Sequence, residues 1–135
     1  MSTFPLQIIT PEKVFFEGNV QRVIIRTTEG DVGILAKHEK YVAAVPAGPL
    51  RITLEDGSER IAAVSGGAVK VSPEQTAVLA NAAEWAEDID VDWAKRSEAD
   101  ALRRKENSKT EQELERAEAK LRRAVNRLRV SSMNK

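Results

Sequence analysis

The sequence predicts a mainly β domain, an antiparallel sandwich or barrel, followed by a C-terminal α-helical hairpin. All seven glycines and all five prolines lie between residues 5 and 73 of the 135-residue chain. Charged residues shift the other way, because residues 87–135 carry 24 of them and the longer stretch 1–86 carries only 18. Such a break in composition marks a boundary, so we expect a β domain at residues 1–86 and a helical domain at 87–135.

Short segments rich in β-branched residues run through the first domain, as is typical of strands. They cover residues 6–9, 20–25, 50–54, 60–64, 68–71 and 76–79. Turn signals separate them, including Glu17-Gly-Asn19, Glu29-Gly30, Asp56-Gly57 and Gly66-Gly67. We expect a two-residue hairpin at Asp56-Gly57, where both positions tolerate φ > 0, and a strand-ending turn at Ser65-Gly66-Gly67. Strands at this spacing indicate a sandwich or a barrel.

Two helices are predicted in the second domain. An aspartate, Asp90 or Asp92, caps the first, which runs to about Lys105. A break follows at Asn107-Ser-Lys109, and Ser108 with Glu111 fits a capping box for the second helix. The second helix has an apolar stripe (Leu114, Ala117, Leu121, Ala124 and Leu128, with Val125 beside them), and the first a weaker one (Ala94, Ala101 and Leu102). These few apolar side chains predict a weakly held, movable hairpin.

Composition excludes several classes of protein. The chain has no cysteine and a single histidine, His38, which excludes thiolate chemistry and multi-histidine metal centres. No phosphate-binding loop or nucleophile elbow is present, so we expect no enzyme activity. A net charge of zero argues against nucleic-acid binding. Short apolar runs and the lack of a signal-like N-terminus predict a cytoplasmic protein without membrane insertion. His38 is expected in a polar loop after a strand.

The end of the chain is strongly basic. Residues 119–135 contain six basic side chains and no acidic one. A helix C-terminus favours some of these cations, and a solvated face explains more. The remaining bias indicates an acidic protein partner, because guanidinium groups grip carboxylates.

The motifs along the chain resemble those of the bacterial ATP synthase epsilon family over nearly its full length. The similarity rests on their order and spacing: Ile9-Thr-Pro-Glu-Lys13, Phe16-Glu-Gly18, Glu29-Gly-Asp-Val-Gly-Ile-Leu35 with His38, Pro46-Ala-Gly-Pro-Leu-Arg-Ile52, Gly66-Gly67, Ala83-Glu-Trp-Ala-Glu-Asp-Ile-Asp90 and Asn126-Arg-Leu-Arg-Val130. One departure is Ala36-Lys37, where the family has Pro-Gly. The resemblance implies a sandwich of about ten strands, then a helical hairpin.

The resemblance also implies a function: a non-catalytic rotor subunit that couples c-ring rotation to the catalytic head. It places the sandwich on the gamma subunit, through His38, and on the c ring, through Glu29, Gly30, Asp31 and Gly33, with Gly30 and Gly33 permitting a tight backbone. The hairpin would inhibit ATP hydrolysis by extending toward the alpha and beta subunits. Its basic tail, defined as Arg116, Lys120, Arg122, Arg123 and Arg127, would meet acidic residues of beta. The protein would lie peripherally at the cytoplasmic face of the cell membrane.

Some members of the family bind ATP as a regulatory ligand, and the resemblance implies a weakened form of that site here. Glu84, Asp90, Ala94 and Arg127 match it. Trp93 replaces an arginine, and Asp100 stands where ATP-binding relatives have another. Beyond ATP, no cofactor or metal is expected. The alternatives are an ATP-sensing module whose hairpin folds around nucleotide, and a β-sandwich adaptor with a coiled-coil tail that is unrelated to ATP synthase.

Overall fold

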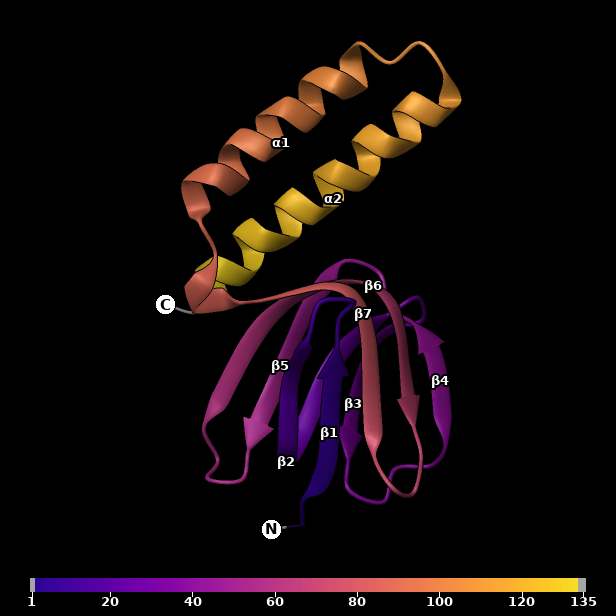
Figure 1. Ribbon diagram of the computed structural model, residues 1–135, viewed down its shortest axis with the longest axis vertical. Helices are drawn as coiled ribbons and strands as arrows, with labels where there is room; N and C mark the ends of the chain where they lie inside the picture. The colour runs from indigo at the N-terminus through magenta and orange to yellow at the C-terminus, as the bar shows by residue number, and fades with distance from the viewer. Residues whose placement is uncertain (1, 134–135) are drawn as a thin grey trace. The chain divides into compact units, whose positions relative to one another are not determined.

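The computed structural model describes residues 2–133 and divides into two compact units, residues 1–85 and 86–135. Within the described residues, the first unit contains seven strands (Figure 1). They are β1 (Phe4–Ile9), β2 (Val14–Thr27), β3 (Gly30–Leu35), β4 (Tyr41–Ala44), β5 (Gly48–Leu54), β6 (Glu59–Val71) and β7 (Thr76–Trp85). The second unit contains a short 3-10 turn, η1 (Ala86–Asp88), and the helices α1 (Val91–Glu106) and α2 (Glu111–Met133).

The first unit is a β-sandwich whose two layers share their longest strands. The first halves of β2 and β7 pair with β1, whereas later residues of β2 pair with β3 and β5. In the same way, β6 pairs first with β5 and then with β4, and β7 follows it along most of its length. About ten strands were expected, and the described part of the chain has seven. The number is lower because single long strands contribute to both layers.

The glycine pair at positions 66 and 67 lies inside β6 and does not end a strand. Gly66 and Gly67 have φ of 71° and 108°, and β6 remains paired with β7 on both sides of them. A Cβ at Gly67 would lie 1.7 Å from the Leu79 carbonyl oxygen, so only glycine fits this close approach. The predicted turn at Ser65-Gly66-Gly67 is therefore wrong: the glycines let β6 continue from one layer to the other.

Two further turn predictions need correction. Glu17-Gly-Asn19 lies within β2, where Gly18 pairs with Leu6. At Asp56-Gly57 only Gly57 has a positive φ, 87°, and the Leu54 carbonyl accepts from its N–H at 3.0 Å. Leu54 then donates its own N–H to the Ser58 carbonyl, so the turn spans three residues with one left-handed glycine. The Asp56 carboxylate accepts from the Ser58 hydroxyl, which lowers the pKa of Asp56.

The sandwich core is aliphatic. Burial of these side chains from both layers is the main favourable term in holding the layers together. Fully buried members include Leu6, Ile8, Val20, Val23, Ile25, Ile34, Leu50, Ile52, Val64, Val69 and Val78.

The second unit is a helical hairpin whose buried positions are mostly small. Of the two predicted caps, Asp90 and Asp92, it is Asp90 that caps α1, accepting from the Trp93 N–H at 3.0 Å. The buried residues are Ala94, Ser97 and Ala101 on α1, and Ala117, Ala124, Asn126 and Val130 on α2. Leu102 and Val125, assigned to the apolar stripes from sequence, are 46% and 37% exposed. Those two assignments were wrong.

The break between the helices lies where it was predicted, but the capping residue differs. Thr110 Oγ1 accepts from the Glu113 N–H at 3.1 Å, and the Glu113 carboxylate accepts from the Lys109 N–H at 2.9 Å. Ser108 instead donates its hydroxyl to the Arg104 carbonyl at the end of α1. The cap of α2 is therefore Thr110 with Glu113, which corrects the predicted pair Ser108 and Glu111.

Candidate interaction sites

The turn between β2 and β3 is a rigid, polar projection. Gly30 has φ of 111°, and its carbonyl accepts from the Thr27 hydroxyl at 2.8 Å. The same hydroxyl oxygen accepts from the Glu29 N–H at 3.1 Å. Gly33, by contrast, lies within β3 without a positive φ, and a Cβ there would meet nothing within 4 Å. The tight backbone thus depends on Gly30, and the expected role of Gly33 in it was wrong.

Asp31 projects from the start of β3 beside Arg26 on β2. The Arg26 Nε donates to Asp31 Oδ1 at 3.0 Å, and the aspartate side chain remains 52% exposed. The two residues are direct partners in the register of the antiparallel pair, the position at which opposite charges interact best. Asp31 therefore presents to solvent a carboxylate that is paired with a guanidinium.

His38 lies in the loop between β3 and β4, as predicted, and is linked to Glu29 through Tyr41. The rings of His38 and Tyr41 meet edge to face with centroids 6.1 Å apart. The Tyr41 hydroxyl donates to Glu29 Oε2 at 3.1 Å. The expected gamma-contact and c-ring-contact residues are therefore neighbours joined by one tyrosine. Sequence analysis missed Tyr41, because the hydrogen bond joins residues in separate strands and loops.

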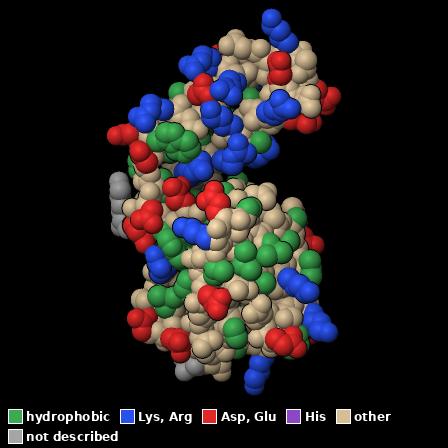
Figure 2. All heavy atoms as spheres, in the orientation of Figure 1, with side chains coloured by type: hydrophobic (Ala, Val, Ile, Leu, Met, Phe, Trp, Pro, Cys, Tyr) green, Lys and Arg blue, Asp and Glu red, His purple; other side chains and the backbone are tan. Residues whose placement is uncertain are grey.

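The outer face of one layer carries an apolar row. It consists of residues that are direct neighbours across five strands: Val14, Ile9, Leu79, Ala68 and Ala44. Val14 and Leu79 are 52% and 53% exposed, although the adjacent Val78 is buried in the core. Val42, on β4, is 69% exposed. Figure 2 shows hydrophobic side chains on the face of the sandwich in view. We use the name outer apolar row for the five paired residues Val14, Ile9, Leu79, Ala68 and Ala44.

The only pattern in the sequence that could have revealed the outer apolar row is a lack of alternation. Val78 and Leu79 are consecutive apolar residues in one strand, and so are Ile8 and Ile9. Consecutive apolar residues point to opposite faces of a sheet, so one of each pair had to face outward. Strand pairing then brings these outward residues together, which the sequence alone does not specify.

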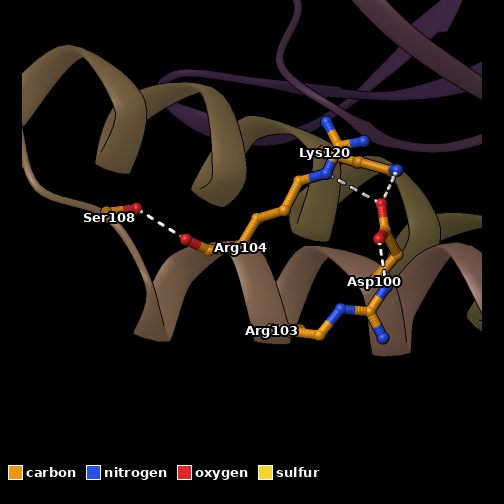
Figure 3. A network of polar contacts seen from close by, with 5 residues as sticks. All are labelled: Asp100, Arg103, Arg104, Ser108 and Lys120. Carbon is orange, nitrogen blue, oxygen red and sulfur yellow. Dashed lines mark hydrogen bonds and ion pairs between the residues drawn. The ribbon is translucent and has the colours of Figure 1, made fainter.

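In the hairpin, one carboxylate gathers three cations from both helices (Figure 3). Asp100 of α1 accepts from Arg103, pairs with Arg104 Nε at 3.0 Å, and accepts from the Lys120 ammonium of α2. The Lys120 hydrogen bond, followed by the nearby Arg104 charge, holds the pKa of Asp100 below its ordinary value. This ionised carboxylate therefore joins the two helices at mid-length.

The five basic-tail residues divide into two groups. Arg116, Arg122 and Arg123 are exposed on α2. Lys120 is held by Asp100, and the Arg127 guanidinium lies 5.0 Å from the centre of the Trp93 ring, within cation–π distance. Figure 2 shows how densely Lys and Arg side chains cover the visible side of the hairpin.

The residues expected at an ATP site are divided between the two units. Asp90 caps α1, Ala94 is buried, Arg127 lies over Trp93, and Glu84 is on β7 in the other unit. The groove on the hairpin, about 420 Å³, is lined by Asp100, Arg103, Arg104, Asn107, Glu113, Arg116 and Ala117. Asp100, which stands where ATP-binding relatives have an arginine, lies in this groove with its carboxylate in contact with three cations.

Residues 2–133 contain no group of three or more His, Cys, Asp or Glu side chains placed to hold a metal ion. Within the same range, none of the helices is both long enough and apolar enough to span a bilayer. Ser65 lies inside β6, in regular strand pairing and not at a sharp exposed turn.

Comparison with known proteins gives consistent matches over both units. The family described as "ATP synthase, Delta/Epsilon chain, beta-sandwich domain" matches residues 3–86, and the "long alpha-helix domain" of the same chain matches residues 87–132. An "ATP synthase epsilon chain" of Ruminococcus albus is 47% identical, and the match covers 98% of each chain. One of Caldicellulosiruptor bescii is 39% identical, with 100% of this chain and 98% of the relative covered.

Solved structures share the fold. A chain of the Euglena gracilis mitochondrial ATP synthase, in a structure of "OSCP/F1/c-ring", superposes with a TM-score of 0.80 at 24% identity, covering 90% of this chain and 77% of that one. A chain from the Tetrahymena thermophila mitochondrial ATP synthase "central stalk/cring" gives a TM-score of 0.65 at 16% identity, with 96% and 97% covered. At these identities the superpositions concern the fold alone.

Proposed function

The chain belongs to the ATP synthase delta/epsilon family as an epsilon subunit, a non-catalytic part of the central stalk, and on that premise we propose how its two units act. The sandwich, residues 1–86, docks on the gamma subunit and on the c ring, and so helps to couple ring rotation to the catalytic head. The hairpin, residues 87–135, restrains ATP hydrolysis. The observation that carries the docking proposal is the outer apolar row.

The outer apolar row is the surface proposed for the gamma subunit. Contiguous apolar side chains exposed on a folded domain mark interaction sites, and burying them contributes about 25 cal/mol per Å² of apolar area. Val14 and Leu79 each leave about half of their surface exposed in the isolated chain. Val42 extends the row along β4, which begins three residues after His38. His38 is thus proposed at the rim of the same interface.

The β2–β3 turn is the proposed contact with the c ring. It presents the polar groups of Glu29 and Asp31 on a backbone fixed by Thr27 and Gly30. Rigid turns lose little conformational entropy on binding, which suits a contact that must hold while the rotor turns. Tyr41 links Glu29 to His38, so the proposed c-ring and gamma contacts lie next to each other. This attachment would hold the subunit peripherally at the cytoplasmic face of the cell membrane.

The hairpin supplies the proposed contact with the catalytic head. Arg116, Arg122 and Arg123 are exposed on α2, and their guanidinium groups suit acidic residues of the alpha and beta subunits. The helices are held together by small buried residues and ion pairs. Such a hairpin opens at lower cost than a domain with a large apolar core.

The docking proposal is tested by Leu79→Glu, which places a carboxylate in the outer apolar row. Binding to purified gamma subunit should fall at least about tenfold, a change that corresponds to roughly 1.4 kcal/mol. Arg51→Glu is the control, since Arg51 is exposed on β5 in the other layer. Circular dichroism checks that both variants fold. Equal binding by Leu79→Glu and the unmodified chain would contradict the proposal, as would equal loss in both variants.

A second test addresses the c ring. A cysteine introduced by Asp31→Cys in the assembled complex should crosslink to a c subunit under oxidising conditions when a cysteine is also placed in the polar loop of c. Glu59→Cys, at the start of β6, is the control. No product with c, or no more product than Glu59→Cys gives, would show that the β2–β3 turn does not face the polar loop of c.

A further inference from the structure

Two side chains of α1 each contact one of the five basic-tail cations. The Asp100 carboxylate holds the Lys120 ammonium, and the Trp93 ring lies under the Arg127 guanidinium. The Asp100 and Lys120 side chains are 24% and 28% exposed, whereas Arg103 and Arg104 are 66% exposed. The contact that crosses between the helices is thus the most shielded part of the network.

From this arrangement we propose that α1 masks the basic tail: Asp100 and Trp93 withhold Lys120 and Arg127 from an acidic protein surface until the hairpin opens. The inference rests on the proposed function of the hairpin and adds its regulation. Acidic groups on the partner compete with Asp100 for the same ammonium. The folded hairpin presents three tail cations to a partner, and the open one presents all five.

The surroundings of Asp100 carry more positive than negative charge, so an acidic partner can approach this network. Arg103 and Arg104 face it from α1, and Lys120 faces it from α2; Arg116 and Glu113, also on α2, line the adjoining groove with Asn107. Acidic groups that a partner brings near this network can therefore shift the equilibrium between the closed and the open hairpin.

The pH dependence has a defined sign. The pKa of Asp100 is lowered in the folded chain, first by the Lys120 hydrogen bond. Its contribution to closing is fully present above the ordinary aspartate pKa, about 3.9, and is lost as the pH falls through the lowered value. At neutral pH the carboxylate is ionised, so an acidic partner acts on the closed hairpin while proton uptake does not.

The first experiment uses the full-length chain with Asp100→Asn, which removes the charge and keeps the shape. Amide hydrogen exchange at mid-α1 and mid-α2 should accelerate about threefold to fivefold, the range expected for an exposed ion-pair network. Glu106→Gln is the matched control, because it removes an exposed carboxylate from the end of the same helix. Exchange rates in Asp100→Asn equal to those in Glu106→Gln would overturn the proposal.

The second experiment measures ATP hydrolysis by the assembled enzyme. Asp100→Asn should lower hydrolysis about twofold to fivefold, because an unmasked Lys120 strengthens inhibition. Adding Lys120→Gln should return the rate at least to that of the unmodified enzyme. Unchanged or higher hydrolysis in the single variant would contradict masking, provided that truncation after Asp88 raises the rate. If truncation has no effect, the inhibitory function itself fails, and hydrogen exchange still decides whether Asp100 closes the hairpin.

Discussion

At the scale of single residues, Lys37 adopts a left-handed backbone conformation that residues other than glycine rarely adopt. Among the described residues it is the one non-glycine residue with positive φ, 67°. The turn is closed by a 3.2 Å hydrogen bond from the His38 N–H to the Leu35 carbonyl, with Lys37 in the third position, where type II turns favour glycine. His38 is the last residue of this turn, so the turn geometry positions the proposed gamma contact.

Replacing Lys37 by glycine should stabilise the chain. A left-handed backbone costs a non-glycine residue roughly 1–2 kcal/mol, which glycine avoids. The extra freedom of glycine in the unfolded chain offsets about 0.5–1 kcal/mol of that gain. The net gain should be about 0.5–1 kcal/mol in the free energy of unfolding, measured by urea denaturation. Lys40→Gly, in the same loop but without a positive φ, should bring no gain. Equal effects of the two substitutions would show that the strain at Lys37 is not expressed.

The individual contacts of the candidate sites were the part least accessible from sequence. The resemblance indicated Glu29, Asp31, His38 and the basic tail, but not the partners that hold them. Asp100 and Lys120 are twenty residues apart, and Tyr41 reaches Glu29 across twelve. Both separations along the sequence are too long for the side-chain neighbours that a single helix or strand brings together, so no local pattern could pair these residues.

At the scale of elements, local capping decides where α2 begins. Thr110 and Ser108 are both good capping residues, and each is followed three residues later by a glutamate, Glu113 and Glu111 respectively. The structure selects Thr110, because its oxygen accepts from the Glu113 N–H while Ser108 serves the end of α1. The start of α1 was predicted only as Asp90 or Asp92, and the structure selects Asp90 as the cap.

Thr110→Ala should destabilise the hairpin by about 1 kcal/mol, the usual cost of losing an N-cap. Ser108→Ala should cost much less, because its hydroxyl serves only the Arg104 carbonyl, which can bond to water instead. The free energy of unfolding can be followed by helical circular dichroism in the full-length chain. A larger loss for Ser108→Ala than for Thr110→Ala would restore the capping box inferred from sequence.

The strands show a different limit of sequence analysis. Strand β6 was predicted as two segments separated by Gly66-Gly67, because glycine pairs normally mark turns. Strands β3 and β4 were missed: Gly30 and Gly33 interrupt the first, and the second has only four residues. In each case tertiary pairing overrides local propensity. The fold class survived these errors because it depends on alternating strands and turns and not on their exact limits.

At the scale of the whole molecule, the two units have different means of stability. The sandwich buries a continuous aliphatic core, whereas the hairpin buries mainly alanines and depends on ion pairs. Alanine burial contributes far less than that of leucine or isoleucine. The sandwich is thus suited to permanent attachment, and the hairpin to reversible rearrangement, which is the division of labour proposed for the assembled enzyme.

Removing the hairpin by truncation after Asp88 should raise ATP hydrolysis by the assembled enzyme and leave assembly intact. The sandwich retains all its strands and the outer apolar row in this variant, so its binding to gamma should be unchanged. The increase sets the upper limit of inhibition by this chain. Unchanged hydrolysis across salt and nucleotide conditions would mean that the hairpin does not inhibit.

Replacing the five basic-tail residues by alanine together (Arg116, Lys120, Arg122, Arg123 and Arg127) should also raise ATP hydrolysis. The rise should be a large part of the increase that truncation gives. Each exposed ion pair contributes only about 0–1 kcal/mol, so single substitutions change the rate little and the five act together. Salt gives an independent check, because it screens exposed ion pairs: hydrolysis by the unmodified enzyme should rise with salt more than hydrolysis by the five-fold variant. Lys95→Ala with Arg96→Ala, on the exposed side of α1, controls for general loss of charge. If this control releases hydrolysis as strongly as the five-fold variant, inhibition depends on overall charge and not on a surface of α2.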